Sequence, residues 1–207
     1  MKKTAVFGAL LFIGLLATSF TLPSAEPLTG SERKFAVDYF QKTKQRLLDD
    51  VKGLSAAQLN FKADTSRWSI AQCIEHIAIS ENMVWQWIQG TLQQPATPEK
   101  KSEAKTSTED LIHGMTDRSK KFNAPEMLKP EGKFPDSKAA LAAYTSRRDS
   151  TIAYIGTTQD DLKDHFITHP VFGAMDLYQG LIMLAAHSAR HTLQIEEVKA
   201  NPNFPKE

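Results

Sequence analysis

The chain has 207 residues and a net charge of +1, with 41% hydrophobic and 24% charged residues. This length suits one domain with a short extra segment, and the composition is that of an ordinary globular protein. The charge gives no electrostatic reason to expect nucleic acid or an anionic membrane as a partner. A single cysteine, Cys73, excludes an internal disulfide, so the fold has to rest on its core or on a bound ion.

The N-terminal segment, residues 1–25, differs from the rest of the chain. Lys2 and Lys3 precede an apolar run, and no further charge occurs before Glu26. A basic start, an apolar run and then small residues are typical of a secretory signal peptide. The alternative is an uncleaved membrane anchor through residues 4–25, because the run is nearly long enough to span a bilayer. We therefore expect an exported protein, periplasmic or secreted, whose mature domain has no membrane contact if the signal is cleaved.

Apolar residues at helical spacing dominate the remaining chain, and strand signals are weak. The first long helix is expected from Ser31 to about Val51, and Gly53 stops it. The second is expected to begin after Ser69, a candidate N-cap, and to continue to Gly90. It is apolar on most sides, which is typical of a buried helix.

Two polar stretches containing prolines flank a shorter predicted helix. Residues 91–107 carry two prolines and are expected to form a linker. A helix is expected at about 108–122, with Thr108 as the candidate N-cap. Prolines recur after it, so the whole segment 91–135 is predicted to be a loop-rich insertion.

Two more long helices complete the pattern. One is expected from Ser137 to Gly156 and the other from Asp176 to about Ala200. Four long helices without strands favour an all-α fold, an antiparallel four-helix bundle with one short additional helix. The domain is expected to cover residues 31–200.

Two pairs of histidines are spaced four residues apart. In the first, His165 and His169, the second residue precedes Pro170, which disfavours helical geometry. That spacing therefore does not place the two imidazoles side by side. His187 and His191 instead lie in the last predicted helix and face its apolar stripe. Neighbours on one helical face can both reach a single metal ion.

A third histidine, His76, lies within the buried second helix. Three histidines from two packed helices would form a three-nitrogen site with positions left open for water or substrate, as in catalytic metal sites. The alternative is that each is a core residue with its own hydrogen-bond partners. Burying three imidazoles together without an ion requires three such sets of partners, which is costly. Cys73, one turn before His76, is expected to pack as a small hydrophobic residue.

Other polar and aromatic residues near this face carry weaker expectations. Glu75 and Glu81 lie off the histidine face and are expected to be solvated or paired. Gly180 lies on the apolar stripe of the last helix and is expected to leave open space there. Trp68 is expected to pack in the core or at the end of the bundle, with a pocket wall as the alternative. Arg190 is expected on the flank of its helix, or directed at an anionic substrate.

Two stretches resemble the DinB-like superfamily, in its YfiT-like, metal-dependent hydrolase type. They are "WSIAQCIEHIAISEN" at 68–82 and "HPVFGAMDLYQGLIMLAAHSARHTLQIEEV" at 169–198, and the likeness extends over about 33–200. The resemblance implies a four-helix bundle that holds one divalent metal ion, with zinc or nickel favoured. The metal ligands that it implies are His76, His187 and His191.

The resemblance also implies an activity, hydrolysis of a small-molecule substrate at the metal. Two alternatives stay open: a thiol-dependent S-transferase at the same ion, and a non-catalytic metal-binding or structural bundle. The insertion at 91–135 and the export signal depart from the family pattern, and a small cofactor thiol would be scarce outside the cytoplasm. No catalytic base is assigned, because Ser, Ala and Arg separate His187 from His191. Relatives often dimerise, so a homodimer is a further expectation.

Overall fold

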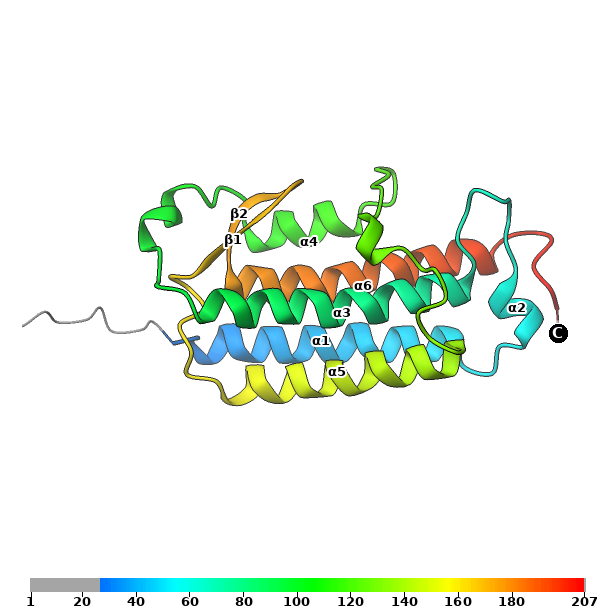
Figure 1. Cartoon of the computed structure of the whole chain (residues 1–207), viewed down its shortest axis with the longest axis horizontal. Coiled ribbons are helices and arrows are strands. Elements are labelled where there is room, and N and C mark those ends of the chain that lie inside the picture. The colour runs from blue at the N-terminus through cyan, green and yellow to red at the C-terminus, as the bar shows by residue number, and fades with distance from the viewer. Residues whose placement is uncertain (1–26, 207) are drawn as a thin grey trace, which may run out of the picture.

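A computed structural model of the protein describes residues 27–206. Its body is a bundle of the four long helices that the sequence predicts (Figure 1). They are α1 (Gly30–Val51), α3 (Ile70–Leu92), α5 (Ser137–Thr157) and α6 (Leu177–Lys199). Helices α1 and α3 each contact both α5 and α6, which closes the ring. The predicted signal peptide at 1–25, and its alternative as a membrane anchor, lie outside the described residues. Among helices within 27–206, none is long and apolar enough to cross a membrane.

Side-chain caps explain where the helices begin. Ser69 caps α3 through a capping box with Gln72, as the sequence predicts, and Asp176 caps α6 in the same way. The short helix α2 (Ala56–Asn60), between α1 and α3, also starts with a capping box. Gly53 follows the end of α1 with a φ of 74°, a conformation that glycine adopts without strain.

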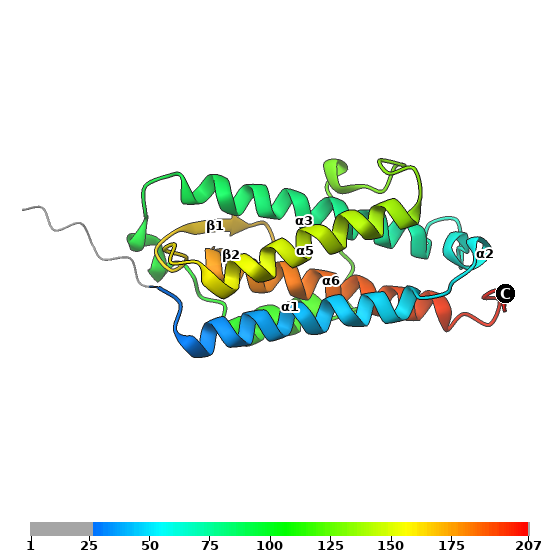
Figure 2. The ribbon, with the colours of Figure 1, turned by 90° about the horizontal axis from the view of Figure 1, so that it is seen from below.

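The directions of the helices differ from the predicted antiparallel arrangement. Helices α1 and α6 run side by side in the same direction, and so do α3 and α5 (Figure 1, Figure 2). At the shared end of α1 and α6, Lys199 Nζ donates to the Asp50 carbonyl oxygen at 2.8 Å. The cause is the long crossover 93–136, which returns the chain along the bundle, so α5 starts at the end where α3 starts. Only short connections force neighbouring helices to alternate.

The crossover contains more regular structure than the predicted loop-rich insertion. It holds two 3₁₀ turns, η1 (Pro98–Ser102) and η2 (Glu126–Leu128), and the helix α4 (Thr108–Thr116), which packs against α6. Helix α4 ends six residues before the predicted boundary of 122. Its N-cap is Ser107, whose Oγ accepts from the Asp110 amide at 3.0 Å, so Thr108 is the first helical residue.

A small β-hairpin shows that the expectation of no strands was wrong. Strand β1 (Phe166–His169) pairs antiparallel with β2 (Gly173–Asp176). Each strand has only four residues, and the connecting turn contains Pro170 and ends at Gly173, with a φ of 75°. Strands this short rarely hold alone. Here Ile167 and Met175 are buried in the core, so tertiary packing supplies what the local sequence lacks.

The hairpin also fills the space that was expected beside Gly180. A Cβ at Gly180 would lie 3.0 Å from Cδ1 of Ile167 in β1. The absent side chain therefore allows the hairpin to approach the start of α6, and no cavity remains at this point.

The hydrophobic core forms two clusters, one toward each end of the bundle. Between them the four long helices place buried polar side chains at similar heights. They are Thr43 from α1, Ser80 and Glu81 from α3, Arg148 from α5, and Ser188 and Thr192 from α6. The three histidines of interest lie close in sequence to this polar layer, on α3 and α6.

Candidate metal centre

The three predicted histidines lie together on two antiparallel helices. His76 is on α3, and His187 and His191 are one turn apart on α6. The Nε2 of His187 lies 3.1 Å from the Nε2 of His76 and 3.2 Å from that of His191. Candidate donor atoms of all three lie within 4.8 Å of one another. His76 and His191 are buried, whereas His187 is half-buried and therefore marks the side open to solvent.

Hydrogen bonds on the far side of two rings fix their protonation. His76 Nδ1 lies 2.7 Å from the Leu128 carbonyl oxygen, and His191 Nδ1 lies 2.9 Å from Gln194 Oε1. Both oxygens only accept, so each Nδ1 carries the proton and each Nε2 presents a lone pair. His187 Nε2 faces both lone pairs and can donate a proton to only one of them. A cation between the three rings would satisfy every lone pair.

The spacing of these nitrogens suits a metal ion. Imidazole nitrogens bind zinc at about 2.0–2.1 Å, so two such ligands lie about 3.3 Å apart at a tetrahedral angle and about 2.9 Å apart at a right angle. The observed separations of 3.1 and 3.2 Å fall between these two values. Zinc and nickel both accept imidazole ligands in such geometries.

The surroundings keep the three imidazoles neutral, which is the form that binds metal. Burial lowers the pKa of His76, although its hydrogen bond to Leu128 opposes this shift. Burial, followed by His76 and Arg190, lowers the pKa of His187 well below its usual value. For His191, burial and the two neighbouring imidazoles have the same effect.

Trp68 forms one wall of the cluster. Its ring centroid lies 4.8 Å from that of His76 and 5.9 Å from that of His191. The residue lies just before the N-cap of α3, so it covers the ligands from the end of the bundle. Its packing role was expected, but its direct contact with two of the imidazoles was not.

Residues 117–133, which we call the strap, pass beside the cluster and are fixed at both ends. At the first end, Arg190 Nη1 donates to the carbonyl oxygens of Met115 and Asp117, at 3.0 and 2.6 Å. At the other end, the Lys133 amide donates to Glu75 Oε1 at 2.6 Å. Arg190 is thus buried with its guanidinium bound to backbone carbonyl oxygens, instead of lying on the flank of α6 or pointing at a substrate.

The carboxylate of Glu81 and the thiol of Cys73 are near His76 in sequence but do not join the histidine cluster. Glu81 is paired, as one of its alternatives predicted, but it is fully buried with Arg148. Cys73 is also fully buried, and burial raises the pKa of its thiol to about 12. The thiol therefore stays protonated and packs in the core, in agreement with the expectation.

The other closely spaced pair does not form a metal site. His165 contacts the backbone carbonyl oxygens of Asp161 and Gln94 through its two ring nitrogens, at 2.8 and 3.0 Å. His169 Nδ1 accepts from the Val171 amide at 3.2 Å. Both residues lie at the hairpin and not on a helix, so their spacing of four residues does not place the two imidazoles on one helical face.

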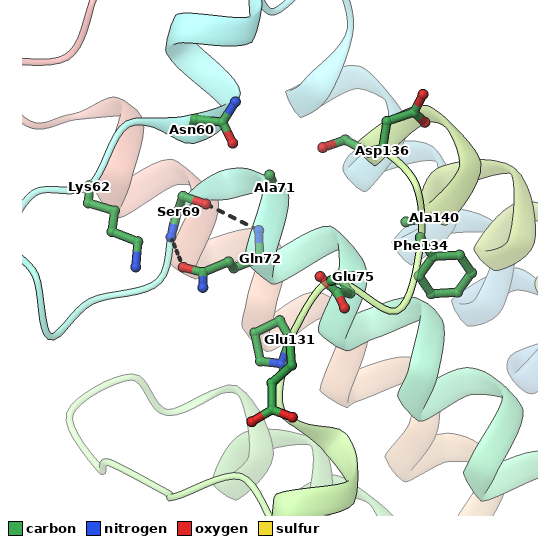
Figure 3. A pocket seen from close by; sticks show the side chains of 13 residues that line it. Asn60, Lys62, Ser69, Ala71, Gln72, Glu75, Glu131, Phe134, Asp136 and Ala140 are labelled. Atoms are coloured by element: carbon green, nitrogen blue, oxygen red, sulfur yellow. Dashed lines mark hydrogen bonds between the residues drawn. The ribbon is translucent and has the colours of Figure 1, made fainter.

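A cavity of about 430 Å³ lies at the end of α3, between the α2 end and residues 130–137 (Figure 3). The capping pair Ser69 and Gln72 forms part of its wall, and the side chains of Lys62, Glu75 and Glu131 also line it. None of the three histidines does. No sequence pattern indicated this cavity, because its walls come from segments far apart in the chain.

Two partners of the histidines were missed at the level of sequence. Gln194 follows His191 by three residues on the same helix, so its position could have indicated a hydrogen bond. Leu128 contributes only its carbonyl oxygen, which no side-chain pattern reveals.

The protein is therefore a four-helix bundle with a candidate metal centre between two antiparallel helices, α3 and α6. A sequence model of the DinB superfamily matches residues 39–195, and the chain belongs to this superfamily. The resemblance noted in the sequence is thereby confirmed.

Two Bacillus subtilis proteins are similar to this chain. "Uncharacterized protein YuaE" (strain 168) is 24% identical over 160 residues, which are 77% of this chain and 94% of that protein. A solved structure of YfiT, described as "a probable metal-dependent hydrolase with an unusual four-helix bundle topology", matches with a TM-score of 0.61. The match covers 87% of this chain and 93% of YfiT at 14% identity, so it shows a shared fold.

Proposed function

We propose that the protein binds one divalent metal ion, zinc or nickel, and hydrolyses a small-molecule substrate at it. The proposed ligands are His76, His187 and His191. The observation that carries the proposal is the convergence of three Nε2 atoms, two of them in rings whose Nδ1 protons are already committed to oxygens. Membership of the DinB superfamily and the fold shared with YfiT support it.

The protein's own residues have distinct parts in this proposal. A bound divalent ion supplies Lewis-acid chemistry, which polarises an oxygen of the substrate or of water. Leu128 and Gln194 orient two of the ligands, and Trp68 shields them from solvent. Among the described residues no carboxylate joins the histidine cluster, so the proposal assigns no Asp or Glu there as a base.

Metal content tests the site. The purified full chain, loaded with Zn²⁺ or Ni²⁺ and freed of excess metal, is expected to retain about one ion per chain by elemental analysis. The His187→Ala/His191→Ala double variant is expected to retain almost none. His113→Ala, an exposed histidine on α4, is the matched control and should bind like the parent. Equal metal content in the parent and the double variant would show that the site is wrong.

A substrate panel then tests the reaction. Esters, amides and lactones are offered to the metal-loaded parent, alone or with small thiols as acceptors. Turnover without thiol that disappears in the double variant supports a hydrolase. Turnover only with thiol would replace the proposal by S-transfer, and bound metal without any turnover on the panel would favour a non-catalytic metal-binding protein.

Export and a homodimer are separate proposals. Export rests on the composition of residues 1–25, and the homodimer rests on the family resemblance. The mass and N-terminal sequence of the protein from a cell envelope fraction test cleavage at the end of that segment. Sedimentation of the purified protein tests the dimer.

A further inference from the structure

We propose that the open position of the three-histidine site takes an anionic ligand, a carboxylate or a comparable oxyanion. The inference rests on the proposed metal site and deepens the proposed function, because it names the substrate class. Its basis is the charge of the groups around the cluster. The groups that contact the ligands are neutral, and a buried cation, Arg190, lies one turn away along α6.

Within residues 27–206, the groups that hydrogen-bond to the ligands carry no negative charge. The three ligands are neutral imidazoles, and the two oxygens that accept from their Nδ1 atoms belong to a backbone carbonyl, Leu128, and an amide, Gln194. Metal-binding histidines often donate to a carboxylate, which offsets part of the charge of the ion. Here a divalent ion would keep both positive charges, so an anion at the open position would be favoured.

Arg190 adds a buried positive charge beside the same cluster. It lies three residues after His187 on α6 and is only 4% exposed. Its hydrogen bonds go to the carbonyl oxygens of Met115, Asp117 and Lys120, and its guanidinium lies 4.7 Å from the Phe122 ring centroid. Carbonyl oxygens and a ring face hold this charge in place, and the nearby carboxylates of Asp117 and Glu197 offset part of it. Arg190 follows His187 by about one turn of α6, so its field reaches the cluster.

The nearby Arg118 is different, because it forms a two-point ion pair with Glu197, with both distances at 3.0 Å. Together the two residues are close to neutral, so the pair adds little to the field. The pair is useful as a probe, since either charge can be removed alone or both can be removed together.

Access to the site also agrees with an external ligand. His187 is half-buried, whereas His76 and His191 are buried and lie against Trp68. Of the three ligands His187 is therefore the most exposed, so we expect a ligand to reach the ion on its side. Charge interactions are stronger in such a partly buried position than at an exposed surface.

The test uses the full chain loaded with Co²⁺, whose visible absorption reports on the ligands of the ion. Acetate is titrated against acetamide, which has a similar size and shape but no charge. We expect acetate to change the spectrum in a saturable manner and acetamide to leave it unchanged at the same concentrations. Gln194→Glu, which places a carboxylate next to His191 Nδ1, should bind Co²⁺ and weaken acetate binding at least tenfold.

The ion pair provides the matched controls. Arg118→Gln should weaken acetate binding and Glu197→Gln should strengthen it, each by roughly three- to tenfold at low salt. The double variant Arg118→Gln/Glu197→Gln should return to the affinity of the parent. If Gln194→Glu does not fold or loses Co²⁺, these three variants decide the question.

Failure of the inference and failure of the proposed site give different results. A parent that does not bind Co²⁺ overturns the metal site, and the inference with it. A parent that binds Co²⁺ but responds equally to acetate and acetamide, or whose charge variants all match the parent, overturns the anionic ligand and leaves the metal site standing.

Discussion

The bundle buries two polar groups that differ in charge: the histidine cluster, whose members are all neutral, and the ion pair of Glu81 with Arg148. In the ion pair, an anion on α3 meets a cation on α5, and both side chains are almost completely buried. Arg148 also donates to Thr43 Oγ1 at 3.4 Å, and its guanidinium lies 4.5 Å from the Phe40 ring centroid. The two charges balance each other within the chain, although Glu81 Oε2 and Arg148 Nε have no hydrogen-bond partner among the described residues.

The histidine cluster lacks such a counterpart. Its members are alike, neutral and rich in lone pairs, and their proton-bearing nitrogens point outward to Leu128 and Gln194. Both groups involve α3, five residues apart at His76 and Glu81. On this comparison, the ion pair serves the fold, and the proposed role of the histidine cluster is to bind a metal ion.

The largest effect is expected from breaking the ion pair. Arg148→Met leaves the Glu81 carboxylate buried without a partner, and should lower the free energy of unfolding by about 3–5 kcal/mol. Replacing both residues, in Glu81→Met/Arg148→Met, should cost far less, because no unpaired charge remains. Urea denaturation measures both. Equal losses in the single and double variants would contradict the view of a self-contained pair.

Acid should destabilise the metal-free protein through the histidines. Folding lowers their pKa, so the stability that they contribute is present above the unfolded value of 6.5 and is lost as the pH falls below it. The expected loss is about 1 kcal/mol for each of His187 and His191 over the first pH unit below that value. The measurement is urea denaturation between pH 7 and 5, and His187→Ala/His191→Ala should flatten the slope.

Glu81 should act in the opposite direction over the same pH range. Burial raises its pKa from 4.5 to about 7, although Arg148 opposes the shift. The stability linked to Glu81 is therefore full below pH 4.5 and is lost as the pH rises through 7. In Glu81→Met/Arg148→Met this opposing contribution is absent, so the loss of stability in acid should be steeper than in the parent. A slope equal to that of the parent would show that Glu81 is ionised throughout.

Metal should stabilise only through the histidine cluster. At a free Zn²⁺ concentration a hundred times the dissociation constant, the free energy of unfolding should rise by about 2.7 kcal/mol. The same rise is expected in Glu81→Met/Arg148→Met, and none in His187→Ala/His191→Ala. Stabilisation by Zn²⁺ in the histidine variant would mean that the ion binds elsewhere.

The sequence predicted the parts of the fold that local patterns encode. Ser69 with Gln72 and the apolar stripes marked the long helices, and the face of α6 that carries His187 followed from helical geometry. The proximity of His76 required only that two buried helices pack together. These inferences succeed because capping and helical periodicity act within a few residues of the chain.

The missed features depend on contacts between distant segments. The hairpin at 166–176 is held by burial against α6, and the parallel helix pairs follow from the path of the crossover 93–136. Arg190 was misplaced because its acceptors are backbone carbonyls of α4 and the strap, about seventy residues away. A backbone oxygen has no signature in the sequence, and the same reason explains why Leu128 was missed.

The smallest effect is expected from Gln194→Leu, which removes the amide that orients His191. The His191 ring then loses the acceptor that holds its proton on Nδ1, and Zn²⁺ affinity should fall about tenfold. Competition with a chelator measures this change. Gln179→Leu, in the capping box at the start of the same helix, is the matched control and should lower stability without changing Zn²⁺ affinity. If both variants bind Zn²⁺ like the parent, the hydrogen bond of His191 Nδ1 with Gln194 contributes to folding and not to metal binding. The difference between the histidine cluster and the ion pair would then rest on the Nε2 atoms alone.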